Sequence, residues 1–443
     1  MIAEVVGELA GGYIELCRRR LAEEEGLSPT GLLAGLGHLV GSLEEIDALV
    51  PQAKLQQRAS RVSEALGKAE LDRQMAALQA SLAATVAELQ AATPNAAGGL
   101  EGALRTAQAQ ITSLTQDALV ATAPLLVPLC ELLSLRADGM AKHLVTRLHA
   151  ALRDIGRVAR QPTTVPSGML LRAGLTMHMA ASGVAQVPAM LRAQLSSHGL
   201  GGAALGFDAA AMTREMQAAT DALLEGYVEA QAQALSAEVS KRMAATDWVH
   251  HPPPREVTHL VAYLLAELRS AQALASQVVP AEYARPMLPQ GPFPPASAFP
   301  LLQQRSALQG ASQGSSAIHK DLQRMFARKI SFSSAAFLSG GAHHRPTVGG
   351  MLTHIVKLTL KTLVEEARTC TFSRDGFQQL HLDCAMLRWV LPACVDDEGA
   401  ALSLLDELLI SCQERTLEPA PLEHSVLERL CDAKRKELLL ALA

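Results

Sequence analysis

Apolar residues in the first part of the chain recur with the spacing of an α-helix. Between about residues 52 and 92, six of them step by three or four positions: Leu71, Met75, Leu78, Leu82, Val86 and Leu89. This spacing places the six side chains on one helix face. Pro94 and the pair Gly98-Gly99 predict the end of that helix.

The pattern then predicts further helices in the same part of the chain. We expect one over about 100–121, followed by an interruption at Pro124 and Pro128, because proline has no amide N–H for the helical hydrogen bond. Another helix is expected to reach about residue 160.

The middle of the chain combines a long helix with proline-rich text. A helix is predicted over 209–245, and the sequence TDWVHHPPP (246–254) ends it. The next helix is expected over about 255–278. Residues 280–317 are rich in Pro, Gln, Ser and Gly, a composition typical of a flexible linker.

The C-terminal part has the clearest periodicity. A turn is expected at Ser373–Gly376 and a break at Pro419–Pro421, with a last helix from about Glu423. Together the stripes predict a four-helix antiparallel bundle. They comprise Leu352, Ile355, Val356, Leu360, Leu363, Val364 and Ala367 in the first helix, Phe377, Leu380, Cys384, Leu387, Leu391 and Cys394 in the second, and Leu405, Leu408, Leu409 and Cys412 in the third.

Composition supports an all-α fold and argues against some classes of function. Of the 443 residues, 49% are hydrophobic but only 3% aromatic, so Ala and Leu carry the apolar content, which favours helices over strands. The net charge of −5 argues against nucleic-acid binding, which needs a basic face. Four regions are predicted: helical bundles over 1–160 and 161–279, the linker at 280–317, and a bundle over 318–443.

Cysteine usage and hydropathy indicate a soluble, intracellular protein. The 7 cysteines form no CxxC pair, so reduced thiols in a helical core are expected rather than a disulfide framework or a zinc ribbon. The first residues lack the order of a signal peptide, because their basic residues follow the apolar stretch. The longest uncharged run, 173–191, contains His178, Gln186 and Pro188 and would make a poor membrane span.

No group of residues predicts catalysis, a metal site or a cofactor. The pairs His250-His251 and His343-His344 are expected to be exposed loop residues, because neighbours on an extended segment point to opposite sides. His381 and Cys384 share a helix face, but no further ligand lies near them in sequence, so a buried core thiol is favoured. The run 396–398 (DDE) is expected to be a solvated acidic helix start.

Two amphipathic stretches have an alternative interpretation. The segment 319–330 places Leu322, Met325 and Phe326 on one face between basic residues, which an anionic membrane could attract. An ordinary helix with a solvated basic face is favoured. The stripe over 52–92 is expected to form bundle core, with a seam for a partner helix as the alternative.

Several segments resemble the vacuolar protein sorting-associated protein 51 family, also called Fat-free. The resemblance is strong over about 237–431 and includes 241–261, 322–337, 358–391 and 404–431. Its most specific positions are Thr246, Asp247, Trp248, Leu360, Lys361, Thr362, Leu363, Phe372, Arg374, Gly376, Gln378, Gln379, Asp383, Cys384, Leu405, Asp406, Glu407, Pro419 and Pro421. We refer to them as the signature residues, with a structural or interaction role.

The resemblance implies an elongated rod of stacked helical bundles, of the CATCHR tether type. It implies a non-catalytic subunit of the Golgi-associated retrograde protein (GARP) complex and the endosome-associated recycling protein (EARP) complex, acting in endosome-to-Golgi transport. The implied partners are homologues of Vps52, Vps53, Vps54 or syndetin. The implied location is cytoplasmic, peripheral at the trans-Golgi network and endosomes.

Family members normally begin with a longer N-terminal part that binds SNAREs and carries a coiled coil. That part is expected to be missing here, so SNARE binding is assigned to no residue of this chain. Two alternatives stay open: a subunit of a sister tether, the exocyst or the conserved oligomeric Golgi complex, and an all-helical enzyme with a buried site.

Overall fold

The computed structural model describes residues 2–23, 28–91, 99–133, 137–159, 165–183, 189, 193, 208–279, 291–295 and 347–440. Over these residues the fold is all-α, as predicted, and the pairing of Phe372 with Thr416 is an isolated bridge rather than a strand. Contacts divide the chain into two units, Met1–Leu223 and Leu224–Ala443. None of the described helices is both long enough and apolar enough to cross a membrane.

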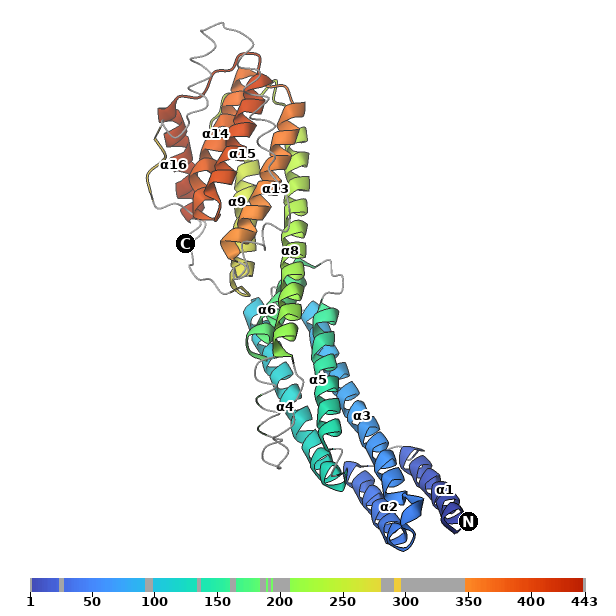
Figure 1. Ribbon diagram of the computed structural model, residues 1–443. Helices are drawn as coiled ribbons and strands as arrows, with labels where there is room; N and C mark the ends of the chain where they lie inside the picture. Colours follow the sequence, from blue (N-terminus) through green and yellow to red (C-terminus); the bar gives the residue numbers. More distant parts are fainter. Residues whose placement is uncertain are drawn as a thin grey trace. The chain divides into compact units, whose positions relative to one another are not determined.

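The first unit is a set of long helices (Figure 1). They are α1 (Ile2–Glu23), α2 (Pro29–Leu49), α3 (Leu55–Ala91), α4 (Gly99–Leu133), α5 (Ala137–Ala159), α6 (Pro166–His178) and the first part of α8 (Ala209–Ala245), with short turns η1 (Pro51–Ala53) and η3 (Met179–Gly183). The predicted stripe of α3 is confirmed as core, since its six residues from Leu71 to Leu89 are at most 5% exposed. It packs mainly on α4 and α5.

The predicted interruption at Pro124 and Pro128 is wrong, because α4 runs through both prolines. Leu125 and Leu129 are completely buried, and their packing compensates for the amide hydrogen bonds that the prolines cannot make. Thr122 lies just before Pro124 in α4, and its hydroxyl donates to the Leu119 carbonyl at 2.9 Å. Tertiary packing therefore overrides the local preference of proline.

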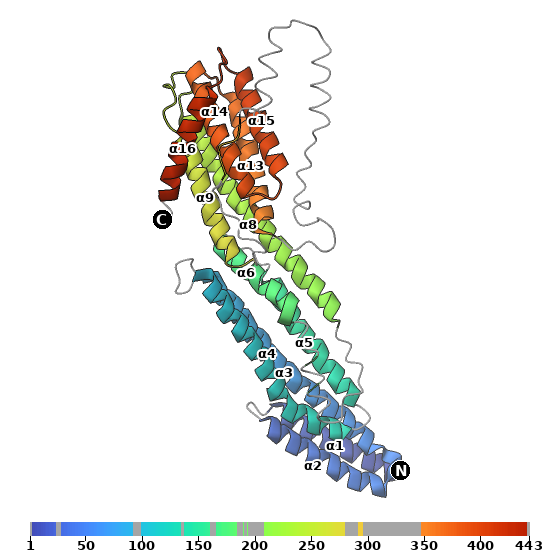
Figure 2. The ribbon, with the colours of Figure 1, turned by 90° about the vertical axis from the view of Figure 1, so that its left-hand side faces the viewer.

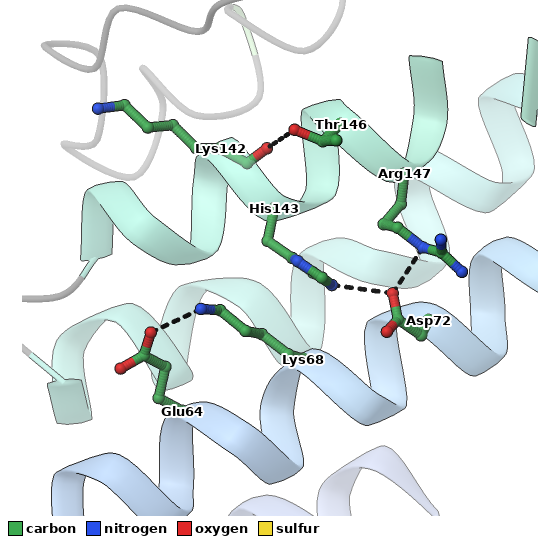
Figure 3. A network of polar contacts seen from close by, with 7 residues as sticks. All are labelled: Glu64, Lys68, Asp72, Lys142, His143, Thr146 and Arg147. Atoms are coloured by element: carbon green, nitrogen blue, oxygen red, sulfur yellow. Dashed lines mark hydrogen bonds and ion pairs between the residues drawn. The ribbon is translucent and has the colours of Figure 1, made fainter. Parts of the chain in front are cut away.

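A polar contact fixes α5 beside α3 in this unit (Figure 3). The Asp72 carboxylate of α3 lies 2.8 Å from Nε2 of His143 and 2.7 Å from Nε of Arg147, both on α5. Close by, Lys68 pairs with Glu64 at 2.6 Å along α3 itself. Gly67 lies in the same part of α3, where a Cβ atom would come within 2.2 Å of Leu129, so the glycine permits close helix packing.

The second unit is a helical bundle that includes residues from before the expected linker (Figures 1 and 2). Its elements are the rest of α8, α9 (His259–Ser276), α13 (Val348–Thr369), α14 (Arg374–Val390), η5 (Leu391–Ala393), α15 (Glu398–Glu414) and α16 (His424–Leu440). α9 packs against α13 and α14, and Ser240 of α8 donates to Glu366 of α13 at 2.6 Å. All predicted stripe residues of the C-terminal helices are buried.

The expected start of the helix after the proline run differs from the structure. It was predicted near Arg255, but α9 begins at His259. Residues 255–258 are irregular instead, because the Glu256 carbonyl and the amide and hydroxyl of Thr258 bond to α14, as described below. The four predicted regions stay a prediction. Within the expected linker, Phe293 is only 7% exposed and contacts Trp389 at a ring-centroid distance of 5.4 Å.

Replacing Leu387 by Asp should disrupt the second unit. Leu387 lies in α14 with 1% of its surface exposed, so the new carboxylate would be buried without a partner. We expect a loss of at least about 3 kcal/mol in the free energy of unfolding. Leu417, which is 78% exposed, provides the matched control. Thermal melts should separate Leu387→Asp from Leu417→Asp, and equal melts would contradict the core position of Leu387.

Candidate functional site

Several signature residues meet where the α8–α9 loop, residues 246–258, lies against the start of α14. Trp248 anchors the first end of this loop. Its indole is 6% exposed, Nε1 donates to the Met243 carbonyl at 3.0 Å, and the ring lies 5.4 Å from the Phe372 ring. The loop is thus held by an aromatic side chain whose polar atom is satisfied.

The backbone of Trp248 also binds the cap of α14. Its carbonyl accepts from the Ser373 amide at 3.0 Å and from the Ser373 hydroxyl at 3.1 Å. The Ser373 hydroxyl oxygen in turn accepts from the Gly376 amide at 3.1 Å, which is the usual N-cap contact. One serine therefore caps α14 and fixes the loop. The sequence predicted only a turn here.

Gly376 is required by this close approach. A Cβ atom at this position would lie 2.3 Å from the Trp248 carbonyl oxygen, which is a backbone atom that cannot move away alone. The signature glycine is therefore explained by contact with a residue 128 positions earlier in the chain, not by a turn conformation.

The second end of the loop is held by Asp383. Its carboxylate accepts from the Thr258 amide at 2.9 Å and from the Thr258 hydroxyl at 2.7 Å. Thr258 is the N-cap residue of α9, yet its hydroxyl bonds to α14 rather than to its own helix. Gln379 adds a bond from Nε2 to the Glu256 carbonyl at 2.9 Å. We call Trp248, Thr258, Phe372, Ser373, Gly376, Gln379 and Asp383 the clasp.

The carboxyl group of Asp383 is buried without a cationic partner among these contacts. Burial raises the pKa of Asp383 to about 7, although the bonds from Thr258 and Gln379 oppose the shift. Nearby, His381 stacks on Phe377, its Nδ1 accepts from the Leu422 amide at 3.2 Å, and burial lowers its pKa to about 4. Burial thus shifts both groups toward their neutral forms.

Phe372 joins the clasp to the end of α15. Its side chain is completely buried, and its amide donates to the Arg415 carbonyl at 3.1 Å. The Phe372 carbonyl accepts from the Leu417 amide at 3.4 Å, and Arg415 Nε donates to the Cys370 carbonyl at 3.0 Å. The loop before α14 is therefore tied on both sides.

The remaining signature residues lie outside the clasp. Leu360, Leu363, Cys384 and Leu405 are core, and Asp406 pairs with the buried Arg388, while Glu407 pairs with Arg368 at 2.7 Å. Thr362 bonds to a carbonyl of its own helix, and Thr246, directly after α8, bonds to the Arg242 carbonyl. Asp247 accepts from the His250 amide at 3.1 Å. The other positions are exposed or half-buried on the surface of the second unit: Lys361, Arg374, Gln378, Pro419 and Pro421.

The histidine pair, the acidic run and the cysteine considered in the sequence analysis are either exposed or engaged in contacts that hold the fold. His250 is exposed, as expected, whereas His251 is half-buried and stacks on Trp248. In the acidic run, Asp397 caps α15 by accepting from the Ala400 amide at 3.0 Å and pairs with Lys357 at 2.7 Å. Burial raises the pKa of the Cys384 thiol, so it stays protonated at neutral pH.

Within the described ranges, no three His, Cys, Asp or Glu side chains group closely enough to hold a metal ion. The pair His343-His344, the basic segment 319–330 and the family-like segment 322–337 lie outside the described residues. Thr258 and Ser373 were missed as site residues. Each precedes a helix as a Ser or Thr cap would, but the sequence gives no sign of its distant partner.

The geometry thus defines an all-α scaffold whose buried polar groups hold its own elements together. Known proteins with similar sequences share one name, "Vacuolar protein sorting-associated protein 51 homolog". The Arabidopsis thaliana protein is 32% identical over 246 residues, covering 50% of this chain and 28% of that protein. The Gallus gallus protein is 26% identical over 450 residues, covering 95% of this chain and 55% of that protein.

The resemblance to the vacuolar protein sorting-associated protein 51 family is therefore confirmed. The Homo sapiens protein of the same name is 27% identical over 215 residues, or 47% of this chain and 26% of its own length. Even where nearly the whole chain aligns, it spans about half the length of these relatives. No family profile and no solved structure matches the chain.

Replacing Gly376 by Ala should open the clasp. The methyl group would force the Trp248 carbonyl away, with loss of its two bonds from Ser373, so we expect about 2–3 kcal/mol less stability. Gly399, in the first turn of α15, has no atom nearer than 3.9 Å to such a methyl group. Gly399→Ala should be neutral or stabilise by about 0.5 kcal/mol. Urea unfolding would test both; equal effects would contradict the close approach.

Asp383 should make stability depend on pH. In the native state the Asp383 carboxyl is protonated below about pH 7, whereas in the unfolded chain it is protonated only below its ordinary pKa of 3.8. Between these two pH values the native state therefore holds more protons. Stability from this group therefore falls as pH rises from about 4 to 7, by up to about 1.4 kcal/mol per pH unit. The amide of Asp383→Asn resembles the neutral acid and does not titrate. The variant should therefore become more stable relative to the native protein as pH rises through that window.

His381 works in the opposite direction, because its native pKa of about 4 lies below its ordinary value of 6.5. The contribution of His381 to the free energy of unfolding rises with pH, and it is the same in the native protein and in Asp383→Asn. The effect of Asp383 is therefore isolated by the difference in stability between these two proteins. Urea unfolding at several pH values from 4.5 to 8 measures this difference. A difference that stays constant with pH would show that Asp383 is ionised throughout.

Proposed function

We propose that the chain is a non-catalytic subunit of a multisubunit vesicle tether, the GARP complex and the related EARP complex. In this role it acts in endosome-to-trans-Golgi retrograde transport and in recycling. The observation that carries the proposal is the set of similar proteins with a single sorting-associated name, of which one aligns over 95% of the chain.

The architecture supports a scaffold role. In the clasp, the carboxylate of Asp383 and the amide of Gln379 bond to backbone and hydroxyl groups of the chain itself. The loop 246–258 thereby becomes a fixed part of the second bundle. Helical bundles that contact only their neighbours can span distance without a binding pocket, and each of the two units is such a bundle.

The proposed partners are the other subunits of the tether, homologues of Vps52, Vps53 and Vps54 or of syndetin. The proposed location is cytoplasmic, with peripheral attachment at the trans-Golgi network and endosomes. For the signature residues we propose two groups of roles. Those of the clasp maintain the second unit, whereas the exposed Arg374 and the half-buried Gln378 contact a partner subunit, with Lys361 exposed on the same unit.

The alternatives have less support. The segments LDE at 405–407 and PAPLE at 419–423 favour the GARP assignment over the exocyst and the conserved oligomeric Golgi complex. An enzyme would need carboxylates or histidines that converge in a deep cavity. Among the described residues, the most deeply buried histidine and carboxylate, His381 and Asp383, are bonded to the chain's own Leu422, Thr258 and Gln379.

Affinity purification of the full-length native protein tests the proposal. We expect recovery of the three partner subunits of the tether, and the same eluate should be probed for exocyst and conserved oligomeric Golgi subunits. Recovery of none of the GARP or EARP subunits would contradict the proposal, and recovery of exocyst or conserved oligomeric Golgi subunits in their place would support the sister-tether alternative.

A further inference from the structure

The α8–α9 loop contains a run of three prolines that is fixed at both ends. The clasp holds the first end through the Trp248 carbonyl and the second end through the amide and hydroxyl of Thr258. Between these two points, residues 251–255 (HPPPR) run without a bend or a turn, and their peptide bonds are all trans. We call residues 251–255 the proline strap.

The sequence of the strap favours the polyproline II conformation. Proline fixes its own φ at about −65° and keeps the residue before it out of the α region, so His251, Pro252 and Pro253 are all restricted to extended dihedrals. Proline also has no amide N–H with which to join a helix or a sheet. A segment of this kind is already extended before a partner binds, which reduces the entropy that binding costs.

Exposure along the strap repeats at every third residue, as expected for a polyproline II helix with about three residues per turn. His251 and Pro254 are half-buried, and the His251 ring stacks on the indole of the clasp at a ring-centroid distance of 5.7 Å. Pro252, Pro253 and Arg255 are exposed. One edge of the strap therefore lies against the second unit, and the other two edges face the solvent.

The exposed edges present the groups that proline-recognition modules bind. Pro252 and Pro253 offer two adjacent rings, which fit between parallel aromatic side chains. The Pro253 carbonyl receives no hydrogen bond from any described residue, so it is open to a donor of the partner. Arg255 forms no ion pair with a carboxylate of the described part of the chain. Its guanidinium can therefore bind an acidic group beside the aromatic side chains.

The spacing of the prolines distinguishes between the modules that bind proline. SH3 domains bind PxxP units, but none of the three prolines in the strap has a second proline three positions before or after it. A WW domain closes one pair of aromatic side chains over two adjacent prolines, and the strap supplies such a pair. The residues after the prolines then select within the WW class. Here they are Arg255 and Glu256 rather than a tyrosine.

We propose that the proline strap is a docking site for a WW domain, whose aromatic clamp holds Pro252 and Pro253 while a carboxylate beside the clamp pairs with Arg255. The contact area is small, so the complex is weak, with a dissociation constant in the micromolar range. The site connects this chain to a protein that carries a WW domain. It depends on no tether subunit, so it stands apart from the proposed function.

Titration of the purified full-length chain into fluorescently labelled WW domains tests the site by anisotropy. We expect saturable binding to a WW domain of the class that takes proline runs with arginine, and none to a WW domain that requires tyrosine. Pro253→Ala and Arg255→Ala should each weaken binding at least about tenfold. Both residues are exposed, so both variants should keep the native melting temperature.

Two matched controls test the location. The sequence has one other run of adjacent prolines, Pro294-Pro295, which is followed by alanine. Pro295 is exposed, and Pro295→Ala should bind like the native chain. Arg429, an exposed arginine of α16, provides the equivalent control for charge, so Arg429→Ala should also bind like the native chain.

Four results would overturn the proposal. The first is a native chain that binds neither WW domain at concentrations up to about 500 μM. The second is binding that Pro253→Ala and Arg255→Ala leave intact, and the third is binding that Pro295→Ala or Arg429→Ala weakens equally. The fourth is tighter binding of a labelled SH3 domain than of the WW domain, which would contradict a single aromatic clamp.

Discussion

The second unit depends on the attachment of one irregular segment to α14 at two points. At the first, the Trp248 carbonyl receives both donors of Ser373, at 3.0 and 3.1 Å. At the second, the Asp383 carboxyl receives both donors of Thr258. Between them lies HHPPP, a sequence that supplies few amide donors of its own. Because both ends are bound, α9 enters the bundle from a fixed position, and the helices before and after the expected linker form one core.

The same attachment explains why polar residues occur deep inside an otherwise Ala- and Leu-rich bundle. A neutral Asp383 satisfies Thr258 at little electrostatic cost, whereas an ionised one would be buried without a cation among its contacts. Hydrogen bonds between fixed partners also specify one position of the loop, which apolar contacts alone define less sharply. The polar side chains in this region therefore serve the geometry of the bundle.

Periodicity was sufficient for much of the fold but not for the clasp. The stripes of α3 and α13–α15 and the bounds of α8 follow from local spacing, and the structure confirms them. The break at Pro124 and Pro128 was wrong because packing of Leu125 and Leu129 outweighs the lost bonds. Trp248 and Asp383 were singled out only because they lie in the segments that resemble the family. Their partners lie about 125 residues away, and no local pattern encodes such a contact.

The α1 and α3 stripes show what periodicity alone leaves undecided. Both repeat by three and four residues, and both fit either bundle core or a seam for a partner helix. In α3 the stripe is at most 5% exposed, so other helices of its own unit occupy it and the partner-helix alternative for α3 is excluded. In α1 the equivalent stripe is 43–73% exposed while a second face fills the core. A helix needs only one apolar face to join a bundle. The second apolar face of α1 is therefore not needed to hold the helix in its own unit.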